Sequence, residues 1–186
     1  MARVTQIFTV VAATDLAIDA TNNKKATSAT HTFVAADVGK YVNVTAGTGF
    51  TVAANQIASV VGGAAIGVNS FGTTSSTSGV FTIPNRIASS QTLGDRLFVQ
   101  MKTAGTGLGY VLCSNNGGGV PSKANDPGSD GVSSDIVAEL PPAGTTYPGG
   151  TYSDPQPGGG NFEDMAAYWV DGAVNGDKVR VSYNKR

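Results

Sequence analysis

Apolar and polar side chains alternate along most of this chain, which is the pattern of strands with one buried face. In the segment Lys178–Tyr183 the apolar positions Val179, Val181 and Tyr183 share one face, and polar side chains occupy the other. Antiparallel strands that bury one face show this alternation. Because the same period recurs in nearly every readable segment, the chain is predicted to be all-β.

Turn residues separate the predicted strands. The expected strands are Val4–Val11, Thr30–Val34, Tyr41–Thr45, Ile57–Val61, Ala64–Asn69, Val80–Ile83, Arg96–Met101, Gly109–Cys113, Ile136–Leu140, Ala166–Val170 and Lys178–Tyr183. The pair Gly62-Gly63 predicts a tight hairpin, since glycine adopts positive φ readily. The run Gly105–Gly109 predicts another hairpin. Short strands at regular spacing favour an antiparallel β-sandwich or barrel.

The domain organisation follows from a composition shift before Pro84. A Ser-, Thr- and Gly-rich stretch covers residues 72–79. We therefore expect two small β-modules, one over residues 1–84 and one over 96–186, joined by a linker over 85–95.

Two regions are expected to be long loops. Residues 115–134 and 141–161 are rich in Gly, Pro, Asp and Asn, and they exceed the usual length of a connection. They carry little apolar surface, so they are expected either to be mobile or to be held by a partner.

Composition and charge exclude several classes of protein. Charged residues make up 13% of the chain, about half the usual share, so charge-driven disorder is excluded. The net charge of −1 gives no general attraction to nucleic acid or to an anionic membrane. No apolar run is long enough to span a bilayer, and Thr9 interrupts the first apolar stretch, so no signal peptide is expected. The single cysteine favours folding in a reducing cytoplasm.

The charges are unevenly distributed along the chain. Residues 1–102 contain seven basic and four acidic residues, whereas residues 124–177 contain nine acidic residues and no Lys or Arg. The acidic stretch is expected to contact a basic surface of a neighbouring copy or another protein; the alternative is a set of solvated acidic loops. The candidate interaction residues are Asp126, Asp130, Asp135, Asp154, Glu163, Asp164 and Trp169.

A search for catalytic groups predicts that the chain is not an enzyme and needs no cofactor. The only histidine is His31, and a single histidine is not enough for a histidine-based zinc site. No serine lies in a G-x-S-x-G turn, and Cys113, next to Val111 and Leu112, is interpreted as a small apolar residue. No Walker loop is present.

Carboxylates were considered for hydrolysis and for metal binding. Glu163, Asp164 and Asp171 lie near Trp169, as a glycosidase would need, but adjacent residues of a strand point to opposite faces. Residues 125–131 with Asp135 are similar to a calcium-binding loop. They lack the Glu of the EF-hand pattern, and a turn capped by Asp and Asn side chains is preferred. No metal is therefore expected.

One segment resembles a pattern that recurs in virion proteins of tailed bacteriophages. It consists of residues 29–44 (ATHTFVAADVGKYVNV), 47–50 (GTGF) and 56–60 (QIASV), and the resemblance covers roughly residues 1–83. In this segment Val42 and Val44 are expected to face the core, with Tyr41 and Asn43 on the other face. The second half is similar, more loosely, to small β-sandwich modules on phage heads and tails.

The resemblance implies a non-enzymatic structural protein, a capsid decoration or cement protein on the outer head lattice. The implied partners are the major capsid protein or other virion proteins, in a homo-oligomer or symmetric array on the head exterior, assembled in the host cytoplasm. The alternative is a tail, baseplate or fibre component that binds sugars. In that case Trp169, Tyr147, Tyr152 and Tyr168 would stack on the sugar, although Trp169 also fits a core position. A glycan hydrolase is a more distant third.

Overall fold

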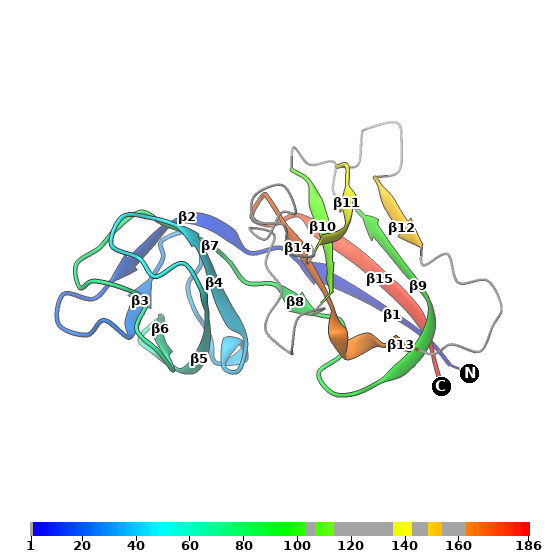
Figure 1. The fold of residues 1–186 in the computed structure, drawn as a ribbon, viewed down its shortest axis with the longest axis horizontal. Helices are drawn as coiled ribbons and strands as arrows, with labels where there is room; N and C mark the ends of the chain where they lie inside the picture. Colours follow the sequence, from blue (N-terminus) through cyan, green and yellow to red (C-terminus); the bar gives the residue numbers. More distant parts are fainter. Residues whose placement is uncertain (1, 103–106, 114–135, 143–148, 154–162) are drawn as a thin grey trace, which may run out of the picture. The chain divides into compact units, whose positions relative to one another are not determined.

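The computed structural model describes residues 2–102, 107–113, 136–142, 149–153 and 163–186. These residues form antiparallel strands and two short 3-10 turns, so the expected all-β class is confirmed. The chain divides into two compact units, drawn in Figure 1. We call Val11–Pro84 the barrel unit, and Met1–Val10 with Asn85–Arg186 the sandwich unit. No helix in the described ranges is long and apolar enough to cross a membrane.

The barrel unit is a closed six-stranded barrel with strand order β2-β3-β6-β5-β4-β7. Its elements are β2 (Ala12–Ile18), β3 (Lys25–Thr27), the 3-10 turn η1 (Ala35–Asp37), β4 (Tyr41–Ala46), β5 (Ala54–Val61), β6 (Ala64–Gly67) and β7 (Gly79–Thr82). Pairing of β7 with both β2 and β4 completes the ring. Closure removes the unpaired edges through which open sheets associate.

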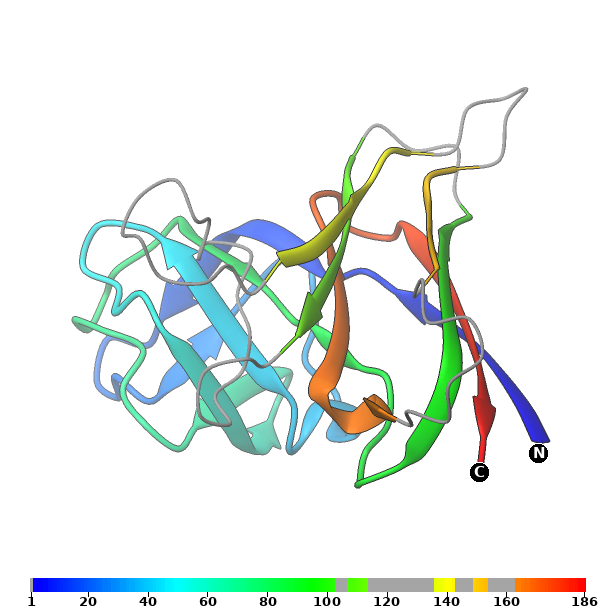
Figure 2. The ribbon, with the colours of Figure 1, turned by 45° about the vertical axis from the view of Figure 1, so that its right-hand side comes forward.

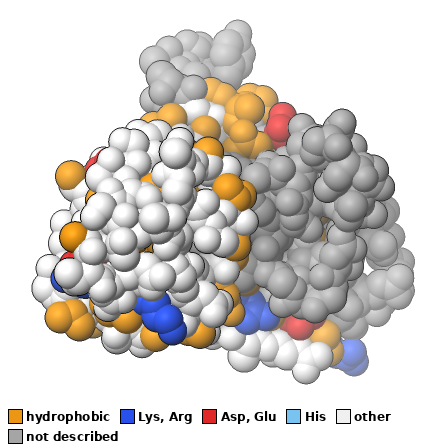
Figure 3. Space-filling model, turned by 60° about the vertical axis from the view of Figure 1, so that its left-hand side comes forward, with side chains coloured by type: hydrophobic (Ala, Val, Ile, Leu, Met, Phe, Trp, Pro, Cys, Tyr) orange, Lys and Arg blue, Asp and Glu red, His pale blue; other side chains and the backbone are white. Residues whose placement is uncertain are grey.

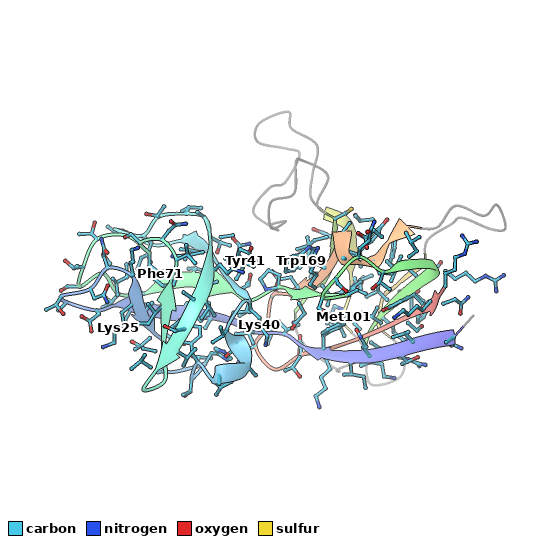
Figure 4. The ribbon with its side chains drawn as sticks, turned by 90° about the horizontal axis from the view of Figure 1, so that it is seen from below. Lys25, Lys40, Tyr41, Phe71, Met101 and Trp169 are labelled. Atoms are coloured by element: carbon cyan, nitrogen blue, oxygen red, sulfur yellow. The ribbon has the colours of Figure 1, made fainter. Side chains whose placement is uncertain are left out.

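Aromatic side chains fill the barrel. Phe33, Phe71 and Phe81 are each at most 1% exposed, and the rings of Phe33 and Phe81 stack with centroids 6.2 Å apart. Phe71 is labelled among the barrel strands in Figure 4. Val42 and Val44 are buried in this core, as the alternation predicted. Asn43, predicted on the opposite face, is buried as well, at 2% exposure.

The local pattern was right for one barrel turn and wrong for one strand. Gly62 and Gly63 have φ of 58° and 80° and join β5 to β6, so the predicted hairpin is confirmed. The expected strand Thr30–Val34 is absent, and these residues form bends and irregular chain. Neighbouring carboxylates accept hydrogen bonds from the backbone of Thr30 and Val34 in place of a partner strand.

The sandwich unit consists of two sheets. The first has the order β1-β15-β9-β12, with β13 also paired to β9; its strands are β1 (Ala2–Thr9), β9 (Leu93–Met101), β12 (Thr151–Ser153), β13 (Glu163–Asp164) and β15 (Lys178–Lys185). The second has the order β11-β10-β14-β8; its strands are β8 (Asn85–Arg86), β10 (Gly109–Cys113), β11 (Ile136–Leu140) and β14 (Tyr168–Gly172). The 3-10 turn η2 (Met165–Ala167) precedes β14.

The two sheets of the sandwich unit are both visible in Figure 2. Each sheet has a buried apolar face. Val179, Val181 and Tyr183 of β15 are buried, which confirms the face predicted from their alternation. Gly109 of β10 packs against Met101 of β9 so closely that a Cβ at position 109 would overlap the Met101 sulfur. Removing apolar surface from water in this way is the main stabilising contribution to such a unit.

Long-range pairing changes the expected domain boundaries. β1 pairs with β15 along its whole length, from Ala2 opposite Lys185 to Thr9 opposite Lys178, so the first ten residues belong to the sandwich unit. Much of the expected linker 85–95 is also part of this unit, because β8 pairs with β14 and β9 begins at Leu93. The predicted module boundary near Pro84 coincides with the end of the barrel unit.

Two further expectations need correction. The run Gly105–Gly109 does not connect a hairpin, because β9 and β10 lie in different sheets. The second expected loop, 141–161, is interrupted by β12, which pairs with β9. Residues 114–135, which include the first expected loop, lie outside the described part of the chain.

Candidate functional site

The segment that carries the phage-like pattern is held in place by two carboxylates. Asp15 of β2 accepts hydrogen bonds from Ser28 Oγ at 2.6 Å, from the Thr30 backbone at 2.8 Å and from Thr30 Oγ1 at 2.9 Å. Burial acts to raise the pKa of Asp15, but these hydrogen bonds outweigh it and lower the pKa. They stabilise the ionised carboxylate, which in turn fixes the chain before residue 31.

Asp37 fixes the second half of this segment. Its side chain is 5% exposed and accepts hydrogen bonds from Lys40 Nζ at 2.9 Å and from the Val34 backbone at 3.1 Å. His31 Nε2 lies 3.1 Å from Asp37 Oδ2, the oxygen that also accepts the hydrogen bond from the Val34 backbone. Burial acts to raise the pKa of Asp37, yet the hydrogen bonds and the charge of Lys40 lower it. Lys40, labelled in Figure 4, supplies the main compensating charge.

The only histidine is therefore used within the fold. The His31 ring contacts Asp37 and packs edge-on against Phe33, with ring centroids 5.1 Å apart. It lies in the segment where the strand Thr30–Val34 was expected, and its side chain is 19% exposed. No group of three or more potential metal ligands occurs among the described residues.

The same segment presents apolar side chains to solvent. Val34 and Val38, on either side of η1, are 50% and 47% exposed, and Val61 at the end of β5 is 61% exposed. Two backbone hydrogen bonds attach this segment to β5 and its turn, Phe33 N to Gly63 O and Gly39 N to Ile57 O. We call Val34 and Val38, which flank η1, the valine surface. Exposed apolar side chains on a fixed backbone are suited to contact with another protein.

The valine surface was missed at the sequence level. Val34 was assigned to a strand, and its exposure depends on the 3-10 turn that replaces this strand. The available signal was the pair of valines that flanks the polar residue Asp37. On the face drawn in Figure 3, hydrophobic side chains lie among polar groups.

Most of the acidic residues predicted to mediate interactions lie outside the described residues. These are Asp126, Asp130, Asp135 and Asp154, and the calcium-like loop and Tyr147 lie there too. Glu163 is described only through its backbone, which pairs with Gly94 in β13. The acidic stretch as a contact surface therefore stays a prediction.

Asp164 has a structural role at η2. Its Oδ1 accepts hydrogen bonds from the Ala166 backbone at 3.0 Å and the Thr92 backbone at 2.9 Å. A side-chain oxygen that accepts from the first turn in this way is an N-cap. One oxygen of the proposed glycosidase pair is thus already engaged with the backbone.

Trp169 occupies a buried position, in agreement with the core interpretation. It is 8% exposed, and the Arg86 guanidinium lies 5.6 Å from its ring centroid. Its neighbour in the sequence pattern, Asp171, is 1% exposed and accepts a hydrogen bond from the Gly172 backbone at 2.8 Å. Trp169 is labelled in Figure 4. An 8% exposed ring offers little area for stacking on a sugar.

Tyr110 lies on the middle one of three neighbouring strands, with Glu139 on one side and Asp171 on the other. Tyr110 of β10 is opposite Glu139 of β11 and opposite Asp171 of β14. Burial, followed by the negative charges of Glu139 and Asp171, raises the pKa of Tyr110. Cys113, at the end of the same strand, is half-buried.

Comparison with known proteins gives no relative for this chain. No protein-family model matches it, no curated protein is significantly similar, and no solved structure matches its fold significantly. Function has to be inferred from the residues and their geometry.

Proposed function

We propose that the chain is a non-enzymatic structural protein of a tailed-phage virion, a decoration or cement protein bound to the outer head lattice. The observation that carries this proposal is the segment 28–40, in which the Asp37 carboxylate holds the backbone and two valines face solvent. Asp37 contacts both His31 and Lys40, while Val34 and Val38 are exposed. The phage-like pattern in residues 29–44 supports the same role.

The physical demands of decoration fit the barrel unit. A subunit that binds a capsid lattice must not associate with itself through open sheet edges, and a closed barrel has none. A small apolar contact is sufficient there because the lattice repeats it by symmetry, and repeated weak contacts add up to tight binding. The proposed partner of the valine surface is the major capsid protein.

The alternative is a tail, baseplate or fibre component. The division into two compact units favours it, since appendage proteins are often built from successive modules. Sugar stacking by Trp169 no longer supports this alternative, because the ring is buried. A glycan hydrolase is third, because Asp164 is engaged at η2.

The location on the particle is tested by immunogold electron microscopy of intact virions with an antibody to this chain. We expect dense label over the head. Label confined to the tail would replace the decoration proposal with the tail alternative, and particles without any label would overturn an exposed virion role.

The valine surface is tested by adding purified variants to heads that lack the protein and measuring occupancy after sedimentation. We expect the double variant Val34→Glu, Val38→Glu to lose most of its binding, because each charge would have to be buried at the contact. Val52→Glu is the matched control, because Val52 is a similarly exposed valine of the barrel unit, at 60%, outside the valine surface. Equal loss in both would argue against this surface.

A further inference from the structure

A second feature lies on the sheet formed by β1, β15 and β9. It is a hollow of about 280 Å³, lined by Arg3, Arg96, Phe98, Ser182, Tyr183 and Asn184. The strand register explains why residues so distant in the sequence meet there. Arg3 is opposite Asn184, and Ser182 is opposite Phe98, so three strands contribute side chains to one face.

An irregularity in β9 places one of the arginines. The register between β15 and β9 shifts between Ser182 and Asn184, and Arg96 at this bulge has a φ of 53°. A non-glycine residue pays a conformational cost in this region. Bulges redirect side chains and are frequent beside functional sites. The strained backbone conformation therefore occurs at an exposed arginine that lines the hollow.

The two arginines bring positive charge to the hollow. The ion pairs found within the described residues involve Asp19 and Asp37 of the barrel unit, and neither Arg3 nor Arg96 takes part in one. Guanidinium groups bind carboxylates through paired hydrogen bonds. Ser182 and Asn184 add groups that can donate to and accept from hydroxyls, and the half-buried Phe98 adds an apolar ring.

We propose that this hollow binds a hexuronic acid unit, a sugar that carries a carboxylate. The arginines would hold the carboxylate, Ser182 and Asn184 the hydroxyls, and Phe98 the apolar face of the sugar ring. The volume lies just below the usual range of about 300–1,000 Å³ for ligand pockets, so it suits one sugar unit. An inorganic anion would leave Phe98 unused. This proposal does not depend on the virion role.

The test is an NMR titration of the full chain with sodium glucuronate, with glucose and inorganic phosphate as comparison probes. We expect glucuronate to shift the backbone amide signals of Phe98, Ser182 and Asn184, and glucose at the same concentration to leave them unchanged. Arg3→Gln and Arg96→Gln should each weaken glucuronate binding about tenfold or more, since each removes a charged hydrogen-bond donor.

The matched control is Arg180→Gln. Arg180 lies on β15 opposite Ile7 and Gln100, outside the hollow, and the change alters the net charge equally. Its affinity for glucuronate should stay within about twofold of the unaltered chain. Far-ultraviolet circular dichroism shows whether each variant is folded, and Arg3→Gln tests the site without altering the bulge.

Three outcomes would overturn the proposal. One is the absence of shifts with glucuronate. Another is an equal loss of binding in the Arg180 variant, which would indicate only general charge attraction. The third is phosphate binding at least as tightly as glucuronate, which would identify a simple anion site.

Discussion

The carboxyl groups of the two units differ in what surrounds them. In the barrel unit, the pKa values of Asp15, Asp19 and Asp37 are all lowered by hydrogen bonds that outweigh any burial. In the sandwich unit, burial raises the pKa of Asp177, which is 4% exposed. The Oδ2 atom of Asp177 has no hydrogen-bond partner within the described ranges. The barrel unit thus gains stability from ionised carboxylates, whereas the sandwich unit loses some by burying one.

Each unit carries its own spectroscopic reporter. The only tryptophan, Trp169, is in the sandwich unit, and the only histidine, His31, is in the barrel unit. Trp169 fluorescence therefore follows unfolding of the sandwich unit, and the NMR signal of His31 follows the barrel unit. The comparison between the units is measurable in a single sample.

The largest loss of stability in the barrel unit is expected from Asp37→Ala. It removes the acceptor of Lys40, His31 and the Val34 backbone from a site that is 5% exposed. Because Lys40 is 42% exposed and stays solvated, the loss comes mainly from the unsatisfied partners of the carboxylate, and it should be about 1.5–3 kcal/mol. Urea unfolding followed through His31 should show this loss, and Trp169 should report little change. Asp19→Ala, which removes a carboxylate from an exposed loop, should have a much smaller effect.

A fall in pH should act next most strongly, and selectively on the barrel unit. The pKa values of Asp15 and Asp37 are lower in the folded chain, so their contribution is present above the unfolded pKa of about 4. It is lost as the pH falls through their folded values. The loss is smaller than that from Asp37→Ala, because a protonated carboxyl can still accept hydrogen bonds. Unfolding at pH 7 and pH 3 tests this, and an equal response of both reporters would contradict it.

Gly39→Ala should cost the barrel unit about 1 kcal/mol. Gly39 has a φ of +86°, and a Cβ built there meets nothing within 4 Å. The cost is therefore conformational and involves no overlap. Gly39→Asn is the comparison, since asparagine tolerates this conformation better and should lose less. Thermal unfolding monitored through His31 measures both, and equal losses would argue against a conformational origin.

The smallest effect is expected from Asp177→Asn, which should increase the stability of the sandwich unit. Since burial raises the pKa of Asp177 in the folded chain, the ionised carboxyl destabilises the sandwich unit at neutral pH. The variant should gain up to about 1 kcal/mol at pH 7. The gain should disappear as the pH falls and the carboxyl of the original chain becomes protonated. Trp169 fluorescence during urea unfolding measures it, and a loss of stability at pH 7 would contradict it.

Two strands were predicted with the bounds that the structure shows. Gly109–Cys113 and Ile136–Leu140 have the predicted bounds. Ala12–Ile18 was missed because a register shift against β7 lies between Ala13 and Leu16, which leaves the buried residues out of strict alternation. The three-residue strands β3 and β12 are too short to produce a periodic signal.

The candidate sites were less predictable because they depend on long-range pairing. Arg3 and Arg96 border one hollow only because β1 and β9 both pair with β15. No local pattern contains this information. Asp37 lies within the phage-like segment. The hydrogen bonds that it accepts from Lys40 and from the Val34 backbone could not be predicted, because they depend on the geometry of the turn. Trp169 was correctly considered for the core, because large aromatic residues are buried more often than they are exposed.

The pairing of β1 with β15 has a consequence for synthesis of the chain on the ribosome. The barrel unit is continuous and its last residue is Pro84, whereas the first sheet of the sandwich unit needs both β1 and β15, which begins at Lys178. Domains tend to fold as units while the chain emerges. We therefore expect the barrel to fold first, while β1 stays unpaired until β15 has been synthesised. During that interval β1 is the part of the chain most exposed to incorrect pairing.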